Sequence, residues 1–423
     1  MLRRFAIVLI LATSCLAQTK NTIDVARMEQ IVQSYVPKQF MGTVLVAEDG
    51  KILFDKGYGF ANLEWQVPNT PTTKFRLGSI TKQFTAVSIL LLEERGKLKV
   101  EDPVKKYMPD APEAWDKITI FNLLTHTSGI PNFTSFPDFP GTEATASTPE
   151  KTVARFRDKP LDFEPGTKWS YSNSGYVLLG YLLEKISGQS YADFVQQNIF
   201  TPLGMKDSGY DSNAAVIANR ASGYSRDKDD VVNAGFVHMS IPFSAGGLYS
   251  TTQDLLRWEQ GLFGGKLLKP ESLAKMTTPF KEDYAFGLGV VASNGHKRIA
   301  HDGGIQGFNT SMAYFPDDKL VVIVLANLNG PFAGQIASQL SKVVHGEKVV
   351  LVSERKEITV SEDILKQYVG TYELAPDFSL VMTNGGRASD DAGARTEKKP
   401  DVCRVGDQVL PQSRGRAGGV LQE

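Results

Sequence analysis

The sequence predicts an α+β fold of the α/β sandwich type, with an antiparallel sheet assembled from both ends of one domain. Apolar, strand-like segments occur at residues 42–61 and again at 284–328, and the chain between them is mostly helical with long irregular loops. Asp49-Gly50 in the first segment and Asp317-Asp318 in the second are typical of tight turns between paired strands. We therefore expect helices to flank this sheet and a mainly helical lobe to be inserted into it.

The predicted elements follow in chain order. An amphipathic helix at residues 23–36 precedes the first two strands, and the next helix runs from Ser79 to Gly96, a glycine suited to a helix C-terminus. Apolar periodicity and capping residues predict further helices at 118–126, 149–157, 175–186, 191–200, 252–263, 270–276 and 331–344. Later strands are expected at 284–293, 297–301, 307–316 and 319–328. A boundary between two such lobes is a natural place for a cleft.

The first residues have the character of a secretory signal. Two arginines precede an apolar run from Phe5 to Ala12, and small residues continue to Ala17, so we expect a signal peptide at 1–17 and export to the periplasm or the extracellular space. A transmembrane anchor is the alternative, but the run is short for spanning a bilayer, and we expect no transmembrane span in the mature chain. Lipid attachment at Cys15 is a weaker alternative.

Charge and cysteine content exclude several classes of function. The 423 residues carry a net charge of −1, which gives no electrostatic basis for binding nucleic acid. Beyond Cys15 the only cysteine is Cys403, so the exported body offers no internal disulfide and no zinc–thiolate site. The five histidines show no metal-binding spacing.

Ser79 and Lys82 form a Ser-x-x-Lys pair at the start of a strongly apolar helix, a context that the three other such pairs in the chain lack. Residues three apart share a helix face, with Cβ atoms about 5–6 Å apart, so the amine can reach the hydroxyl. Burial and the positive end of the helix dipole both disfavour the ammonium form, and a neutral amine can act as the base that makes a serine nucleophilic. The alternative is a capping serine with a lysine that extends to water.

Tyr171 and Asn173 form the only Tyr-x-Asn of the chain, just before a predicted helix. A tyrosine hydroxyl near a lysine can relay a proton to a leaving group, and an asparagine amide can hold a substrate carbonyl or amide. An ordinary N-cap turn is the alternative interpretation.

His301, Gly303 and Gly304 lie at the end of a short predicted strand. A glycine pair beside a strand lets a ligand lie against backbone N–H groups, as an oxyanion hole requires. A hairpin turn with a surface histidine is the alternative.

Taken in order, these three motifs resemble those of the serine β-lactamase and penicillin-binding-protein superfamily. The chain is similar to its class C β-lactamase-like branch, which also includes DD-peptidases, D-aminopeptidases and esterases. The similarity covers roughly residues 23–344 and predicts a hydrolase domain at 22–347. Supporting segments are LLTHTSGIPNF from Leu123, FEPGTKWSYSNSGYVLLGYLLEKISG from Phe163, PLGMKDSGY from Pro202 and AGGLYSTTQDLLRW from Ala245.

The resemblance implies acyl transfer through a covalent acyl-enzyme. Ser79 would attack a carbonyl while Lys82 and Tyr171 move protons, and the N–H groups of Ser79 and Gly304 would stabilise the oxyanion. The acyl group would then pass to water or another acceptor. No metal or organic cofactor is called for.

The resemblance also assigns substrate binding to Asn173, His301, Gly303 and Gly304, with a small molecule or a peptide as the acyl substrate. Lactamases of this branch usually carry lysine where His301 stands, and a histidine is only partly protonated near neutral pH. We therefore expect an amide or ester substrate, such as a D-amino-acid peptide, ahead of efficient β-lactam hydrolysis. A β-lactamase and a non-catalytic penicillin-binding relative are the alternatives.

Two other serine-hydrolase types are disfavoured. The chain has no Gly-x-Ser-x-Gly elbow, so an α/β-hydrolase is not expected. His126, beside Thr127 and Ser128, could suggest a Ser-His-Asp triad, but nothing else supports one. We interpret this segment as a helix end closed by Gly129.

The C-terminal region changes character along its length. Residues 360–383 resemble the start of a small β module often appended to such hydrolases, here truncated, whereas residues 384–423 lose apolar alternation and gain Gly and Arg. Such a composition predicts a disordered tail. We also hypothesise that residues from about Arg387 onward are translated in a shifted reading frame. With suitable codons, a one-base shift from Arg387 yields a sequence that resembles the missing strands of the β module. The nucleotide sequence of the gene would decide between this hypothesis and a disordered tail.

Overall fold

The computed structural model describes residues 23–36, 38–228, 230–293, 295–354, 356–358, 362–375, 378–382, 403–405 and 409–410. The chain forms two compact units, Met1–Glu347 and Lys348–Glu423, and each is described by itself. The signal segment, Cys15 and most of residues 384–423 lie outside the described residues, so the expectations for them remain predictions. No helix in the described part of the chain combines the length and apolar character needed to cross a membrane.

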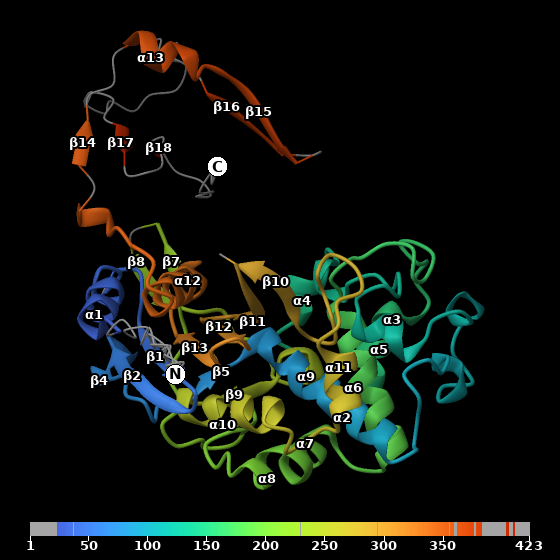
Figure 1. Ribbon diagram of the computed structural model, residues 1–423. Coiled ribbons are helices and arrows are strands. Elements are labelled where there is room, and N and C mark those ends of the chain that lie inside the picture. The colour runs from blue at the N-terminus through green and yellow to red at the C-terminus, as the bar shows by residue number, and fades with distance from the viewer. Residues whose placement is uncertain are drawn as a thin grey trace, which may run out of the picture. The chain divides into compact units, whose positions relative to one another are not determined.

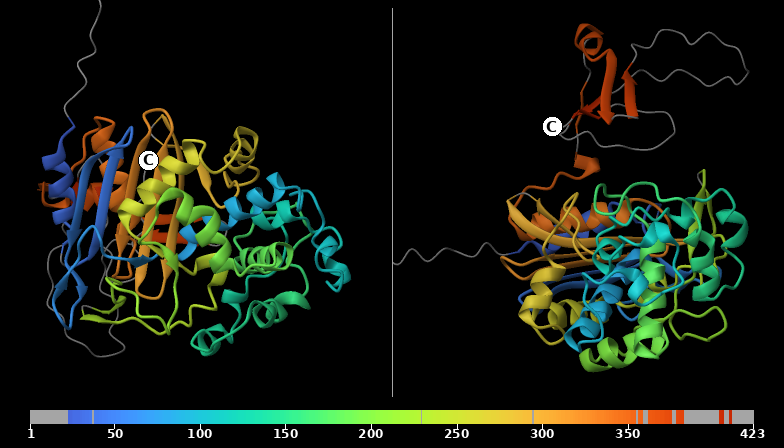
Figure 2. Two further views of the ribbon diagram at one scale, coloured as in Figure 1. Left: turned by 90° about the horizontal axis from the view of Figure 1, so that it is seen from below. Right: turned by 90° about the vertical axis from the view of Figure 1, so that its right-hand side faces the viewer.

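A six-stranded antiparallel sheet organises the first unit, and it draws its strands from both ends of that unit. The strands stand in the order β10-β11-β12-β13-β1-β2, and each neighbouring pair is antiparallel. Figure 2 shows the N-terminal strands beside the strands that close the unit, as the sequence predicts. Their bounds are β1 Gly42–Glu48, β2 Lys51–Tyr58, β10 Gly289–Ser293, β11 His296–Ile305, β12 Phe308–Phe315 and β13 Leu320–Ala326.

The centre of the sheet is apolar on both faces because helices cover both. Strand β13 is buried at every residue, and it pairs with β1 from Gly42 opposite Ala326 to Glu48 opposite Leu320. Helices α1 (Val25–Gln33) and α12 (Phe332–Val344) pack on one side of the sheet, and α10 (Thr252–Phe263) contacts β1 and β13 from the other (Figure 1). The continuous apolar run Leu320–Ala326 thus lies at the middle of the core.

The helical lobe lies beside the sheet and is centred on α2 (Thr81–Glu94), which is buried at every residue from Thr81 to Leu92. A helix that is buried all round is a core helix rather than a surface one. The lobe's other helices are α3 Ile120–Leu124, α4 Phe139–Thr142, α5 Pro149–Arg157, α6 Asn173–Ser187, α7 Tyr191–Val195, α8 Thr201–Leu203, α9 Phe243–Gly246 and α11 Pro270–Met276. A π-helical turn, η5 (Gln196–Phe200), joins α7 to α8.

Small sheets and turns complete the first unit. Two-residue to four-residue strands form a three-stranded sheet in the order β5-β9-β6 and the hairpins β3–β4 and β7–β8. Their bounds are β3 Phe60–Asn62, β4 Val67–Pro68, β5 Phe75–Arg76, β6 Gly209–Tyr210, β7 Tyr224–Asp227, β8 Asp230–Asn233 and β9 Leu248–Ser250. Short 3₁₀ turns are η1 Gly78–Ile80, η2 Val104–Lys106, η3 Glu113–Trp115 and η4 Phe133–Ser135.

The second unit contains short elements. Strands β15 (Gly370–Ala375) and β16 (Phe378–Met382) form an antiparallel hairpin within the predicted start of the β module. The remaining elements are η6 Val352–Glu354, β14 Lys356–Ile358, α13 Glu362–Gln367, β17 Cys403–Val405 and β18 Val409–Leu410. Strands β17 and β18 fall inside the stretch expected to be disordered, where β17 pairs with β14 and with β18.

Three boundaries differ from the sequence prediction. Ser79 lies in the 3₁₀ turn η1 that precedes α2 rather than in the α-helix itself, because the chain enters from Gly78 in a left-handed conformation with φ of 53°. The strand predicted from Tyr284 begins only at Gly289. Strand β11 continues to Ile305, so Gly303 and Gly304 lie in a strand rather than in a hairpin turn.

Candidate active site

Ser79 stands where the helical lobe meets the edge of the sheet. The turn that carries it packs against β11, with Gly78 directly beside Gly304: a Cβ on Gly78 would lie 2.8 Å from the Gly304 nitrogen. Thr310 Oγ1 on β12 donates a hydrogen bond of 2.8 Å to the Leu77 carbonyl and fixes the same turn from the sheet side. The serine is thus held between α2 and the strand by backbone contacts.

The amine of Lys82 is buried and has three close polar neighbours. Its side chain is 0% exposed, and Nζ lies 3.0 Å from Ser79 Oγ, 2.8 Å from Asn173 Oδ1 and 2.9 Å from the Ala245 carbonyl oxygen. The ring centroid of Tyr171 lies 4.8 Å from the same nitrogen. None of these neighbours is a carboxylate, so no anion offsets the burial of an ammonium group.

Burial lowers the pKa of Lys82 well below its ordinary value, which favours the neutral amine. A neutral amine has two N–H donors and one lone pair. The Asn173 and Ala245 oxygens can only accept, so they take both N–H groups, and the lone pair is left facing the Ser79 hydroxyl. The geometry therefore provides a base aimed at the serine proton.

Tyr171 completes the contacts of the serine. Its hydroxyl donates to Ser79 Oγ at 2.7 Å, and burial raises the pKa of Tyr171 above its ordinary value, so the phenol stays protonated. The side chain can therefore act as a proton donor or as a relay, but not as a free phenolate at neutral pH.

Asn173 is the first residue of α6 and is held from the opposite side by the loop at 130–134. Its backbone N–H donates to Asn132 Oδ1 at 3.0 Å, and its Nδ2 donates to Thr134 Oγ1 at 3.1 Å. Because Oδ1 accepts from Lys82, both ends of the amide are assigned by their partners. One amide N–H is left without a protein acceptor among these contacts.

The two glycines of β11 have different environments. Gly303 is buried and packs against the serine turn: a Cβ there would lie 2.0 Å from the Leu77 carbonyl oxygen and 2.2 Å from Thr310 Oγ1. Gly304 is exposed and lines the cavity described below. The neighbouring strand β10 pairs with β11 only from His296 to Ala300, so the Gly304 segment lies beyond that pairing. Gly303 thus permits the close approach, and Gly304 borders the reaction space.

His301 belongs to a chain of hydrogen bonds behind Tyr171. The Ser172 N–H donates to His126 Nδ1 at 3.2 Å, and His126 Nε2 lies 3.2 Å from the Tyr284 hydroxyl. That hydroxyl lies 2.9 Å from His301 Nε2, and His301 Nδ1 lies 2.6 Å from the Asp302 carbonyl oxygen. The Ser172 end of this series of hydrogen bonds is a donor, and the Asp302 carbonyl at the other end is an acceptor. Each neutral histidine therefore has one consistent tautomer.

Burial keeps His301 uncharged near neutral pH. Burial, followed by the nearby Lys82 amine, lowers the pKa of His301 to about 4. Burial also lowers the pKa of His126 well below its ordinary value. The residue type alone predicted that His301 would be partly protonated near neutral pH. In the structure, the position where related lactamases carry a lysine has no positive charge at that pH.

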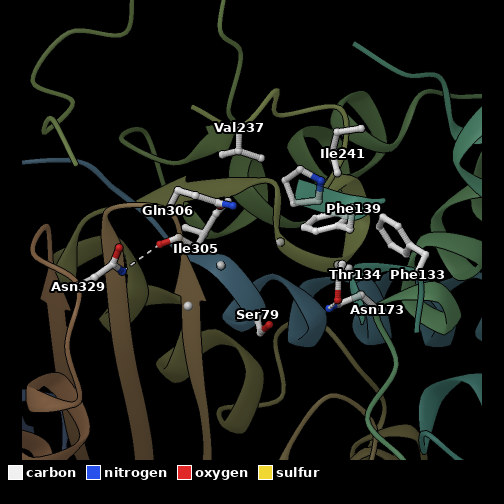
Figure 3. Close-up of a pocket in the computed structure, with 15 residues that line it drawn as sticks. Ser79, Phe133, Thr134, Phe139, Asn173, Val237, Ile241, Ile305, Gln306 and Asn329 are labelled. Atoms are coloured by element: carbon white, nitrogen blue, oxygen red, sulfur yellow. Dashed lines mark hydrogen bonds between the residues drawn. The ribbon is translucent and has the colours of Figure 1, made fainter. Parts of the chain in front are cut away.

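A cavity of about 480 Å³ opens in front of Ser79 (Figure 3). In the close-up, Ser79 lies at its floor between Asn173 on one side and the strand that carries Ile305 on the other. Among the residues described, those that line it include no lysine, arginine, histidine or carboxylate. They are Gly78, Ser79, Phe133, Thr134, Phe139, Asn173, Val237, Ile241, Pro242, Ala245, Gly246, Gly304, Ile305, Gln306 and Asn329.

The structure thus brings Ser79, Lys82, Tyr171 and Asn173 together, and it places Gly304 at the cavity wall. His301 and Gly303 are not among the lining residues. His301 instead packs beside Tyr171, with 6.3 Å between ring centroids.

Sequence reasoning missed three contributors to this site. His126 is buried, with its ring centroid 4.4 Å from that of Tyr171, whereas the sequence suggested only a helix end. The Ala245 carbonyl and Tyr284 have no motif of their own. His126 could have been found from its place in LLTHTSG, but a backbone carbonyl that binds an amine leaves no signal in side-chain identity.

Comparison with known proteins gives consistent matches. Residues 29–344 match the family described as Beta-lactamase. A penicillin-binding protein of Bacillus subtilis is 31% identical over 371 residues, which cover 82% of this chain and 82% of that protein. The octameric penicillin-binding protein homologue of Pyrococcus abyssi is 31% identical with a TM-score of 0.69, covering 82% of each chain. A D-stereospecific amidohydrolase of Streptomyces sp. is 27% identical with a TM-score of 0.65, covering 77% of this chain and 100% of that one.

Proposed function

This chain belongs to the beta-lactamase family and is a serine hydrolase of that type, and from this premise we propose that it is exported and cleaves an amide or ester through an acyl-enzyme on Ser79. The observation that carries the proposal is the set of neighbours around Lys82. Two acceptor-only oxygens take its N–H groups, and the lone pair is left for the Ser79 proton. The roles given below to individual residues are part of the proposal.

Acylation begins when Ser79 Oγ attacks the substrate carbonyl carbon and its proton passes to Lys82 Nζ. The carbonyl oxygen becomes an oxyanion, which the backbone N–H groups of Ser79 and Gly304 stabilise. The bond to the leaving group then breaks, and Tyr171 delivers the proton that Lys82 holds to the departing nitrogen or oxygen. The enzyme is left with an ester between Ser79 and the acyl group.

Deacylation repeats these steps with water. A water molecule attacks the ester carbonyl and gives up a proton to the Lys82–Tyr171 pair, and that proton returns to Ser79 Oγ as the acyl product leaves. Asn173 lines the cavity, and the amide N–H that Thr134 does not accept is suited to hold a carbonyl of the substrate.

The charge of the cavity supports a substrate that carries no carboxylate next to the scissile bond. The lining is apolar apart from hydroxyl and amide groups, and the neighbouring His301 is neutral. A substrate carboxylate placed there would lose hydration without gaining a cationic partner. This favours esters and amides of D-amino acids or other apolar acyl groups over β-lactams, which carry a carboxylate. The amidohydrolase among the relatives is consistent with this choice.

A three-substrate comparison tests the proposal. We expect p-nitrophenyl esters and D-amino-acid amides to be hydrolysed with a kcat/KM clearly above that for nitrocefin. Ser79→Ala should abolish all turnover, whereas Ser353→Ala, which alters the exposed serine of another Ser-x-x-Lys pair, should leave it unchanged. Turnover that survives in Ser79→Ala would refute the assignment, and a preference for nitrocefin would replace the substrate class with β-lactams.

A further inference from the structure

Two of the five histidines meet an aspartate outside the three motifs of the candidate active site. His296 begins β11, Asp318 lies in the turn between β12 and β13, and His345 follows the last residue of α12. One donor atom from each side chain lies within 4.8 Å of the other two. The imidazole rings are stacked, with centroids 3.8 Å apart and planes 3° from parallel.

The contact between His345 and Asp318 has an unusual geometry. The His345 side chain is 5% exposed, and its Nε2 lies 2.9 Å from Asp318 Oδ2. Nevertheless this buried nitrogen makes no well-aligned hydrogen bond, so the carboxylate oxygen lies off the direction of the nitrogen's in-plane bond. His345 Nε2 is thus a buried donor atom that lies beside a carboxylate oxygen and has no aligned hydrogen-bond partner.

The two histidines supply nitrogen donors beside an apolar wall. The ring centroid of Phe315 lies 5.0 Å from that of His345. Neutral imidazole nitrogen is the ligand form, and an ionised carboxylate supplies the third donor.

We propose that His296, Asp318 and His345 form a binding site for one divalent transition-metal ion, with Zn²⁺ as the best match. Two imidazoles and one carboxylate with a fourth position left to water is a common zinc donor set. Zinc–ligand bonds of about 2.0–2.2 Å require the donors to close onto the ion and the stacked rings to turn out of parallel. Cu²⁺ and Ni²⁺ would bind the same donors, whereas Ca²⁺ and Mg²⁺ prefer all-oxygen sites.

The site would tie three separate segments of the sheet unit together. The ion would link the start of β11, the β12–β13 turn and the end of α12, and so act on stability rather than on Ser79 chemistry. No pattern in the sequence predicts this site, because the ligands come from three separate elements and match no metal-binding motif.

Calorimetric titration of the full-length, EDTA-treated protein with ZnCl₂ tests the site. We expect saturable binding of one equivalent, weakened at least about tenfold by Asp318→Asn and by His296→Ala, since even outer-shell changes cost zinc sites 10–100-fold. Asp317→Asn is the matched control, because it neutralises the adjacent exposed carboxylate of the same turn and should bind as the wild type does.

A second readout guards against loss of folding in a variant. At about 100 times the Kd, Zn²⁺ should raise the melting temperature of the wild type and of Asp317→Asn by about 5 °C, and that of Asp318→Asn much less. Co²⁺ should give the visible absorption of a four-coordinate site. No Zn²⁺ binding by the wild type, or equal binding by Asp318→Asn and Asp317→Asn, would overturn the proposal and leave a plain histidine–aspartate contact.

Discussion

A Lys82→Met substitution should change the way in which stability depends on pH. In the folded protein the pKa of Lys82 lies well below its ordinary value because the amine is buried without an anion. In the unfolded chain it returns to about 10.4. Between these two pKa values the unfolded state binds one more proton, so the free energy of unfolding rises with pH by about 1.4 kcal/mol per unit. Methionine has no titrating group and lacks this contribution.

The magnitude follows from that slope. Over two pH units that lie between these two pKa values, the difference in unfolding free energy between wild type and Lys82→Met should grow by about 2.7 kcal/mol in favour of the wild type. Urea denaturation at three pH values in this window measures it. Methionine is close to lysine in length and fills the same buried space, so packing is nearly preserved.

A matched variant separates burial from the chemistry of the side chain. Lys97→Met makes the same change at an exposed lysine just beyond α2 and should leave the difference flat across the window. Parallel pH curves for wild type and Lys82→Met would refute the reasoning, because they would mean that the amine keeps its proton in the fold.

Three further outcomes follow from other contacts. Tyr284→Phe removes the hydroxyl beside His301 Nε2 and should raise the pKa of His301 from about 4 by up to about one unit, measured by NMR titration of the imidazole. Glu259→Gln should stabilise the fold by about 3 kcal/mol at neutral pH, measured by urea denaturation. Burial raises the pKa of Glu259 to about 8, so the wild type loses unfolding free energy as the pH rises above about 4.5, where the unfolded chain ionises. Equal unfolding free energies of wild type and Glu259→Gln above pH 5 would contradict this. Gly303→Ala places a Cβ against the Leu77 carbonyl oxygen and should lower stability by about 1–3 kcal/mol and hydrolysis with it, whereas an unchanged melting curve would show that β11 can move away.

Much of the fold could be predicted because apolar residues recur within each element at the spacing of a helix or of a strand. The helices at Pro149–Arg157, Thr252–Phe263 and Pro270–Met276 begin and end where apolar spacing and capping residues place them. Strand β13 was recognisable as a central strand from its unbroken apolar run. The start of β10 was missed because Tyr284 and Phe286 belong to an apolar loop packed into the site, and composition alone does not separate such a loop from a strand.

The part of the candidate site that consists of motif side chains could be predicted from the sequence. Ser79, Lys82 and Tyr171 meet because helix spacing and one long-range contact bring them together, and the motifs mark all three. The Ala245 carbonyl oxygen, which orients the Lys82 amine, could not be predicted, because every residue type has a backbone carbonyl. The charge of His301 also needed the structure, because its pKa depends on burial by residues distant in sequence.

Active-site labelling tests the central claim most directly. Intact-mass spectrometry after exposure to a fluorophosphonate, followed by peptide mapping, should show one adduct on Ser79 in the wild type. In Lys82→Met the labelling rate should fall by about 10²–10⁴-fold, the usual contribution of a positioned base. An adduct on another residue, or equal labelling of Ser79 without the amine, would contradict the account in which a neutral Lys82 activates that hydroxyl.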